Sequence, residues 1–154
     1  MTAKKLIYEL SGAIGIKTYP IVIEPIEGSR KAEIRSTNGN ISIVMDNRKI
    51  NISKITPDDI FFISHELWHI RQIETGEFDP LSYSPDSTNL ESYNSQPIER
   101  DAHAFSFAVC ATIFGAFPVI YAFSEELNNN IREKALEMKS LPCMIKIKRI
   151  FLRR

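Results

Sequence analysis

Two of the three histidines stand four residues apart in the stretch FFISHELWHIRQ, with a glutamate directly after the first. Residues four apart share one face of an α-helix, so His65 and His69 can direct their imidazoles at one point, as the first two ligands of a zinc ion must. Glu66 would flank that point, where a carboxylate can take a proton from a metal-activated water. The spacing predicts a catalytic zinc site; the alternative is a pair of solvent-facing histidines.

A catalytic zinc ion needs a third protein ligand and an open position for water. Glu99 stands thirty residues after His69, in the segment ERDAHAFSFA. Asp101 is the nearest rival, but it lies about 200° around a helix from Glu99, so both cannot face one metal. We expect Glu99 to be the third ligand.

His103 shares the helical face of Glu99, since it follows four residues later. Two interpretations stand: His103 orients a ligand histidine or touches substrate, or it is a polar residue at the rim of a cavity. Trp68, Phe105 and Phe107 are expected to pack in the core instead.

The ligands are expected to lie on two helices. Thr56, Pro57 and Asp59 supply an N-cap hydroxyl, a first-turn proline and an acid three residues after the cap, so a helix is predicted from here to Gly76. Pro97 predicts the start of the second helix, which continues to about Gly115. Residues 77–95 between them are rich in proline and small polar residues, which predicts a long loop.

The sequence before the motif predicts a small sheet. β-Type runs occupy 19–24, 31–37 and 41–46, and the Asn38–Gly39 pair between the last two predicts a hairpin. Helical spacing at 3–13 predicts a first helix, and another is expected to follow Pro118 and to fade near Ser140. Strands followed by helices indicate an α+β fold.

Composition indicates one globular domain. The chain has 154 residues, of which 44% are hydrophobic and 25% charged, and basic and acidic residues are equal at 19 each. This balance excludes an overall charge that would announce a nucleic-acid or acidic-membrane partner. No apolar run suffices to span a membrane, and the N-terminus does not resemble an export signal. Two isolated cysteines, Cys110 and Cys143, favour free thiols and a cytoplasmic setting.

The last eleven residues contain five basic side chains and no acidic one. We therefore divide the chain into a domain at 1–143 and a basic tail at 144–154. The tail is expected to be solvated or strand-paired; contact with nucleic acid or an anionic membrane surface is the alternative.

The sequence HELWH followed by ERDAHAFSFA resembles the pattern of the ImmA/IrrE-type minimal zinc metallopeptidases, in the gluzincin group. Glu99, Ala102 and Phe105 match that family's spacing, whereas His103 stands where the family has asparagine or aspartate. The resemblance implies a zincin-like domain whose small, mostly antiparallel sheet packs on an active-site helix and a second ligand-bearing helix.

The same resemblance assigns roles. It implies that His65, His69 and Glu99 bind Zn²⁺ and that Glu66 is the catalytic base and proton shuttle. It also implies a cytoplasmic protease acting on a protein or peptide, often a transcriptional regulator or a phage or mobile-element repressor.

Two further expectations concern substrate. A peptide would pair with an exposed edge of the strand at 41–46. Tyr83 and Tyr93 in the long loop are candidates for stabilising the oxyanion, although loop aromatics also serve simply as anchors to the core.

Two functions from different classes follow. The first is a zinc endopeptidase. The second is a catalytically silent binding module that keeps structural zinc and holds a protein or nucleic-acid partner. The intact Glu66 favours the enzyme, because a scaffold has no physical need for that carboxylate.

Overall fold

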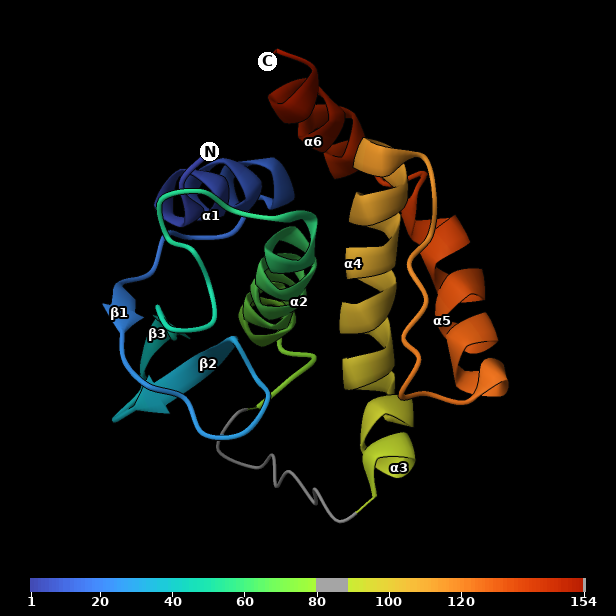
Figure 1. Cartoon of the computed structure of the whole chain (residues 1–154), viewed down its shortest axis with the longest axis horizontal. Coiled ribbons are helices and arrows are strands. Elements are labelled where there is room, and N and C mark those ends of the chain that lie inside the picture. The colour runs from blue at the N-terminus through green and yellow to red at the C-terminus, as the bar shows by residue number, and fades with distance from the viewer. Residues whose placement is uncertain (80–88, 154) are drawn as a thin grey trace.

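The computed structural model describes residues 1–79 and 89–153, which form an α+β fold (Figure 1). In chain order the elements are α1 (Ala3–Ile14), β1 (Ile21–Ile23), β2 (Ala32–Thr37), β3 (Asn40–Met45), α2 (Pro57–Glu74), α3 (Leu90–Ser95), α4 (Pro97–Phe114), α5 (Glu125–Met138) and α6 (Pro142–Leu152). The sheet and α1 lie on one side of α2, and α4 and α5 lie on the other (Figure 1). Helix α2 is therefore central.

The three strands form a mixed sheet in the order β1-β3-β2. β2 pairs antiparallel with β3 through the predicted turn, where Asn38 and Gly39 take φ values of 51° and 78°. Such positive φ values at both positions are what a two-residue hairpin turn requires. β1 pairs in parallel with the other side of β3, with Ile21 opposite Ile43.

The prediction that the strand at 41–46 offers an exposed edge is wrong. β3 carries a neighbour on each side, and the edge strands are β1 and β2. The residue pattern marks strands but not their order, and the parallel return of β1 encloses β3. The edge strand that contacts α2 is β2.

Helix α2 begins and ends as predicted. The Thr56 hydroxyl accepts from the Asp59 backbone N–H at 3.2 Å, and the Asp59 carboxylate accepts from the Thr56 backbone N–H at 2.8 Å. This reciprocal capping box fixes the first turn. After the helix, Gly76 takes a φ of 76°, a conformation that glycine adopts without a steric cost.

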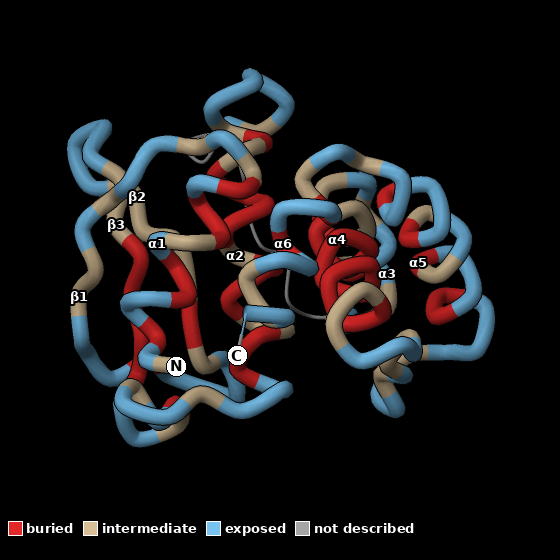
Figure 2. Tube along the Cα trace, turned by 90° about the horizontal axis from the view of Figure 1, so that it is seen from above, coloured by how far each residue is buried: buried red, intermediate tan, exposed pale blue. Residues whose placement is uncertain are grey.

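The interface between α2 and α4 is the centre of the core, and both helices are marked buried along much of their length in Figure 2. The Trp68 ring stacks on Phe105 with centroids 4.3 Å apart, and Phe105 and Phe107 are fully buried. Their predicted core role is confirmed. The Ser106 hydroxyl donates to the Phe61 carbonyl at 2.9 Å, which adds a polar link between the two helices.

The C-terminal half differs from the prediction in three places. The short helix α3 occupies Leu90–Ser95, inside the segment 77–95 that was predicted as a loop. The helix expected after Pro118 begins only at Glu125, capped by the Ser124 hydroxyl. The expected tail is a helix, α6, whose Met144 and Ile147 are buried and which packs on α1 and α4. The boundary drawn between 143 and 144 therefore falls inside α6. None of the helices in residues 1–79 and 89–153 is both long and apolar enough to cross a membrane.

Candidate metal centre

Three buried side chains meet between α2 and α4. His65 Nε2 lies 3.0 Å from His69 Nε2 and 3.1 Å from Glu99 Oε2, while His69 Nε2 lies 3.4 Å from Glu99 Oε1. One ligand atom from each residue lies within 4.8 Å of those of the other two, so the group can hold a metal ion. The three residues predicted as ligands are thus brought together.

The helices explain this convergence. His65 and His69 are one turn apart on α2, and Glu99 is the third residue of α4, so its carboxylate lies in the first turn. Ala102, one turn after Glu99, is fully buried, and its small side chain lets the helices approach. Pro97 at the first position of α4 favours a helix start two residues before Glu99, which places that carboxylate in the first turn.

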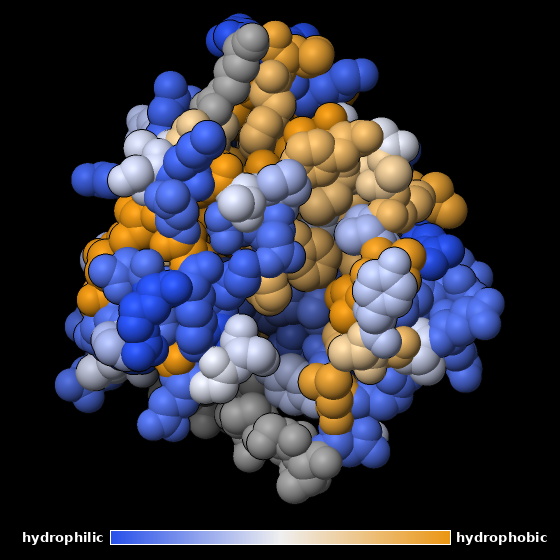
Figure 3. Space-filling view, viewed as in Figure 1, coloured by the Kyte–Doolittle hydropathy of each residue, from blue (hydrophilic) through white to orange (hydrophobic). Residues whose placement is uncertain are grey.

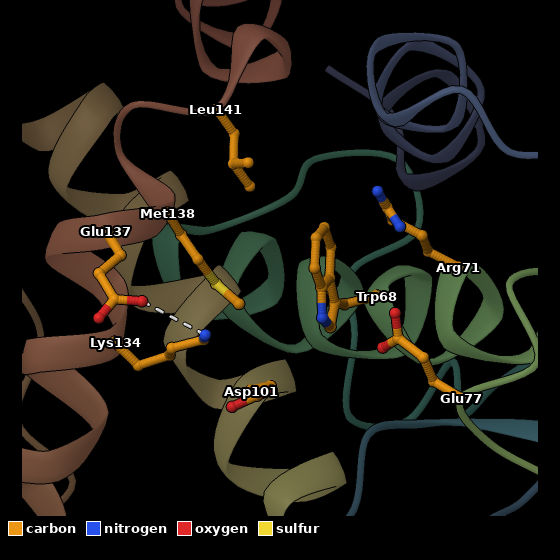
Figure 4. Close-up of a pocket in the computed structure, with 8 residues that line it drawn as sticks. All are labelled: Trp68, Arg71, Glu77, Asp101, Lys134, Glu137, Met138 and Leu141. Atoms are coloured by element: carbon orange, nitrogen blue, oxygen red, sulfur yellow. Dashed lines mark hydrogen bonds and ion pairs between the residues drawn. The ribbon is translucent and has the colours of Figure 1, made fainter.

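Asp101, the rival ligand, points elsewhere. Its carboxylate accepts from the Arg100 guanidinium at 3.0 and 2.9 Å. Figure 4 shows it on α4, lining a separate pocket of about 270 Å³ with Trp68 and Lys134. The structure selects Glu99, as the helical geometry predicted.

The donor set fits a divalent cation. Two imidazole nitrogens at 3.0 Å point at one another, and at most one of them can carry a hydrogen there. The buried Nδ1 of His65 has no hydrogen-bond partner among the described residues. Two imidazoles and one carboxylate, all nearly removed from solvent, are a donor set that zinc accepts.

Without a metal, this group is an ion-pair cluster. Burial opposes ionisation of Glu99, but hydrogen bonds from His65 and His69 outweigh it and hold the pKa of Glu99 well below its usual range. Burial likewise favours neutral His69, yet the hydrogen bond and charge of Glu99 raise its pKa overall. A cation bound here would compete with the proton that the raised pKa favours on His69.

Glu66 is half-buried at the flank of this cluster. Burial raises its pKa, the positive charges of His65 and His69 act in the opposite direction, and the Glu99 carboxylate raises it further. A carboxyl with a raised pKa, close to a candidate metal site, is suited to accepting and returning a proton. Figure 3 shows the face of the molecule hollowed between α2 and α4, with hydrophilic side chains in the hollow.

The short helix α3 adds two contacts. The Tyr93 hydroxyl donates to Glu99 Oε1 at 2.9 Å, so the residue predicted to stabilise the oxyanion contacts a predicted metal ligand here. Asn94 receives a hydrogen bond from His103 Nε2 at 2.8 Å. Tyr83, the other candidate, lies outside the described residues.

His103 lies beside the cluster without belonging to it. Its ring packs on that of His65 with centroids 4.3 Å apart, and it is not part of the ligand group found among the described residues. Burial and the nearby charge of His65 hold the pKa of His103 well below its usual value, so the ring is neutral near pH 7. His103 therefore contacts the predicted ligand His65 by packing.

Sequence reasoning missed Gln72 and Asn94. Gln72 accepts at Oε1 from His69 Nδ1 at 2.8 Å, and Asn94 holds His103. A signal for Gln72 was present, since it follows His69 by three residues and shares its helical face. Asn94 lies in the segment predicted as loop, where no periodicity could assign it.

No family model, curated protein or solved structure matches this chain.

Proposed function

We propose that this protein is a zinc-dependent endopeptidase with a zincin-like fold, in which His65, His69 and Glu99 hold the metal. The observation that carries the proposal is the buried cluster of His65, His69 and Glu99 with a second acidic group, Glu66, directly beside it. Bound zinc would polarise the scissile carbonyl and lower the pKa of a water molecule toward 7.

Glu66 performs the proton transfers. Its carboxylate takes the proton from the attacking water and then delivers it to the leaving amine, because the same group must be a base in one step and an acid in the next. The raised pKa that burial gives Glu66 supports this double role. Tyr93 meanwhile holds Glu99 through its hydroxyl, which keeps that carboxylate directed at the histidines.

The substrate is an extended segment of a protein, bound along the outer edge of β2. β2 is an edge strand and contacts α2, so a peptide paired with it would run beside the helix that carries the histidines. The proposed targets are transcriptional regulators or phage and mobile-element repressors, and the proposed setting is the cytoplasm. The unpaired thiols of Cys110 and Cys143 support a reducing compartment.

A second function has one observation in its favour. The cluster joins α2 to α4, so a bound metal would also brace the core, as in a silent binding module with structural zinc. The two functions differ in what they require of Glu66, since bracing needs only the three ligands.

Glu66→Gln separates them. We expect the variant to bind zinc like the wild type and to lose peptidase activity by about 10²- to 10⁴-fold, because the proton carrier is gone. Zinc-loaded protein is incubated with a library of unfolded peptides and with host-cell proteins, and new termini are detected by mass spectrometry. Glu137→Gln, at an exposed site on α5, is the matched control.

Cleavage by the wild type and Glu137→Gln, but not by Glu66→Gln, supports the enzyme. Undiminished cleavage by Glu66→Gln would refute the mechanism. Zinc binding without cleavage by any variant favours the binding module.

A further inference from the structure

The side chain of Gln72 links the two helices of the metal centre. Its Oε1 lies 2.8 Å from His69 Nδ1, and its Nε2 donates to the backbone carbonyl of Ile98 at 3.0 Å. Gln72 is buried, with 2% of its surface exposed. The side-chain amide thus contacts His69, a predicted ligand on α2. It also contacts Ile98, the residue directly before Glu99, the predicted ligand on α4.

The chemistry of these partners fixes the orientation of the amide. A backbone carbonyl only accepts hydrogen bonds, so the NH₂ group of Gln72 must face Ile98 and its oxygen must face His69. Because that oxygen only accepts, His69 Nδ1 must carry the hydrogen. In the neutral ring, the lone pair is then on Nε2, which is the atom that faces His65 and Glu99.

The backbone around Gln72 is also held. Its carbonyl accepts from the Glu77 N–H at 2.8 Å and from the Phe78 N–H at 3.1 Å, where α2 ends. His65 has no equivalent support, since its Nδ1 is without a partner in the part of the chain that the structure describes. The two histidines are therefore unequal: the hydrogen of His69 is assigned by a neighbour and that of His65 is not.

We propose that Gln72 is the positioning residue of the metal centre. It selects the His69 tautomer that exposes Nε2 to the cation. Through its hydrogen bond to the Ile98 carbonyl it also holds the first turn of α4 against α2, where the Glu99 carboxylate lies beside the two histidines. This inference rests on the proposed metal centre, but not on peptidase activity. Such outer partners of ligand histidines commonly strengthen metal binding.

Nitrogen-15 NMR of the histidine rings reads the tautomer directly, and the chain has only three histidines to resolve. We expect zinc-loaded His69 to carry hydrogen on Nδ1. His103 provides an internal contrast: Asn94 Nδ2 donates to the Leu90 carbonyl at 2.7 Å, so Asn94 Oδ1 must accept from His103 Nε2–H. The two rings should show opposite tautomers, and Nε2–H at His69 would overturn the proposal.

Zinc affinity, measured by competition with a chromophoric chelator, tests whether Gln72 strengthens metal binding. Gln72→Leu removes both hydrogen bonds and should weaken zinc binding by about 10- to 100-fold. Gln72→Glu keeps the acceptor for His69 and should bind zinc more tightly than Gln72→Leu. Asn128→Leu is the matched control, because Asn128 is also a buried amide that bonds backbone groups, at Ile120 on the far side of α4.

Unfolding midpoints of the metal-free proteins separate positioning from stability. We expect Gln72→Leu and Asn128→Leu to lower the midpoint alike, while only Gln72→Leu weakens zinc binding. Wild-type affinity in Gln72→Leu, equal losses in Gln72→Leu and Gln72→Glu, or no zinc binding by the wild type would each overturn the proposal. Zinc binding with the expected tautomer, but without peptide cleavage, would contradict only the proposed function.

Discussion

Two buried carboxylates in this molecule are stabilised by different kinds of hydrogen-bond donor. Asp46, which follows β3, is fully buried and accepts from the Ile26 N–H at 2.9 Å, the Arg48 N–H at 3.0 Å and the Arg48 guanidinium at 2.9 and 2.6 Å. Hydrogen bonds from the Arg48 side chain and from Ile26 hold the pKa of Asp46 far below its usual value. Glu99 also has a strongly lowered pKa, but its partners are histidines and a tyrosine.

The donors decide what each carboxylate can do. Backbone N–H groups and a guanidinium do not give up their protons near neutral pH, so Asp46 is permanently satisfied and serves as a clamp for the turn. Imidazoles do give up protons, so the partners of Glu99 can exchange hydrogen for a cation. Of these two carboxylates, Glu99 is the one whose hydrogen-bond donors a metal ion can replace.

The largest expected effect comes from removing each carboxylate in turn. Glu99→Ala should weaken zinc binding by more than about 100-fold, beyond the loss typical of an outer partner, because a ligand is missing. Asp46→Asn should leave zinc affinity unchanged and lower the unfolding midpoint, because its donors lose a charged acceptor. Calorimetric zinc titration and thermal unfolding check both, and a loss of zinc affinity in Asp46→Asn would break the distinction.

The second-largest effect is expected from a substitution in the α2–α4 interface, whose packing places Glu99 beside the histidines. Ala102→Leu should cost about 1–3 kcal/mol by overpacking the α2–α4 interface, and should weaken zinc binding as the carboxylate moves away from the histidines. Ala135→Leu is the matched control, since Ala135 is also fully buried but lies on α5. Urea unfolding and zinc titration of both variants measure this, and equal zinc affinities would contradict the packing argument.

The ligand helices were predictable because local signals agree with the tertiary structure. Thr56 and Asp59 form the capping box that their spacing predicts, and Pro97 begins α4. Once both helices are placed, helical phase selects Glu99 over Asp101. The hairpin at Asn38–Gly39 was predictable for the same reason, since the turn requires those residues.

Other features depend on partners distant in sequence. The central position of β3 results from its parallel pairing with β1, which no local pattern encodes. The basic side chains at Lys146 and Lys148 suggested a solvated tail, whereas Met144 and Ile147 find a core surface on α1 and α4 and fold α6 against it. Tertiary packing outweighed composition there.

The smallest expected effect is the pH dependence of the stability of the metal-free protein. In the metal-free protein the raised pKa of His69 contributes stability below about pH 6.5, and this is lost as pH rises through the folded value. The lowered pKa of Glu99 contributes stability above about pH 4.3, and this is lost only as pH falls far below that value. The pair should therefore stabilise the metal-free fold most between about pH 4.3 and 6.5.

Melting temperatures of metal-free wild type and Glu99→Gln, measured from about pH 4.3 to well above pH 6.5, check the effect. Their difference should shrink as pH rises above the folded pKa of His69. Zinc should act in the opposite direction, stabilising more as pH rises, because it competes with protons for the imidazoles. A difference that grows with pH would contradict the assigned pKa directions.

The central claim is tested most directly by a crystal structure of the protein grown with zinc, with anomalous difference density recorded across the zinc edge. We predict one peak at bonding distance, about 2.0–2.2 Å, from His65 Nε2, His69 Nε2 and a Glu99 oxygen. Zinc bound elsewhere with no peak between these residues, or a Glu99 carboxylate turned away from both rings, would contradict it.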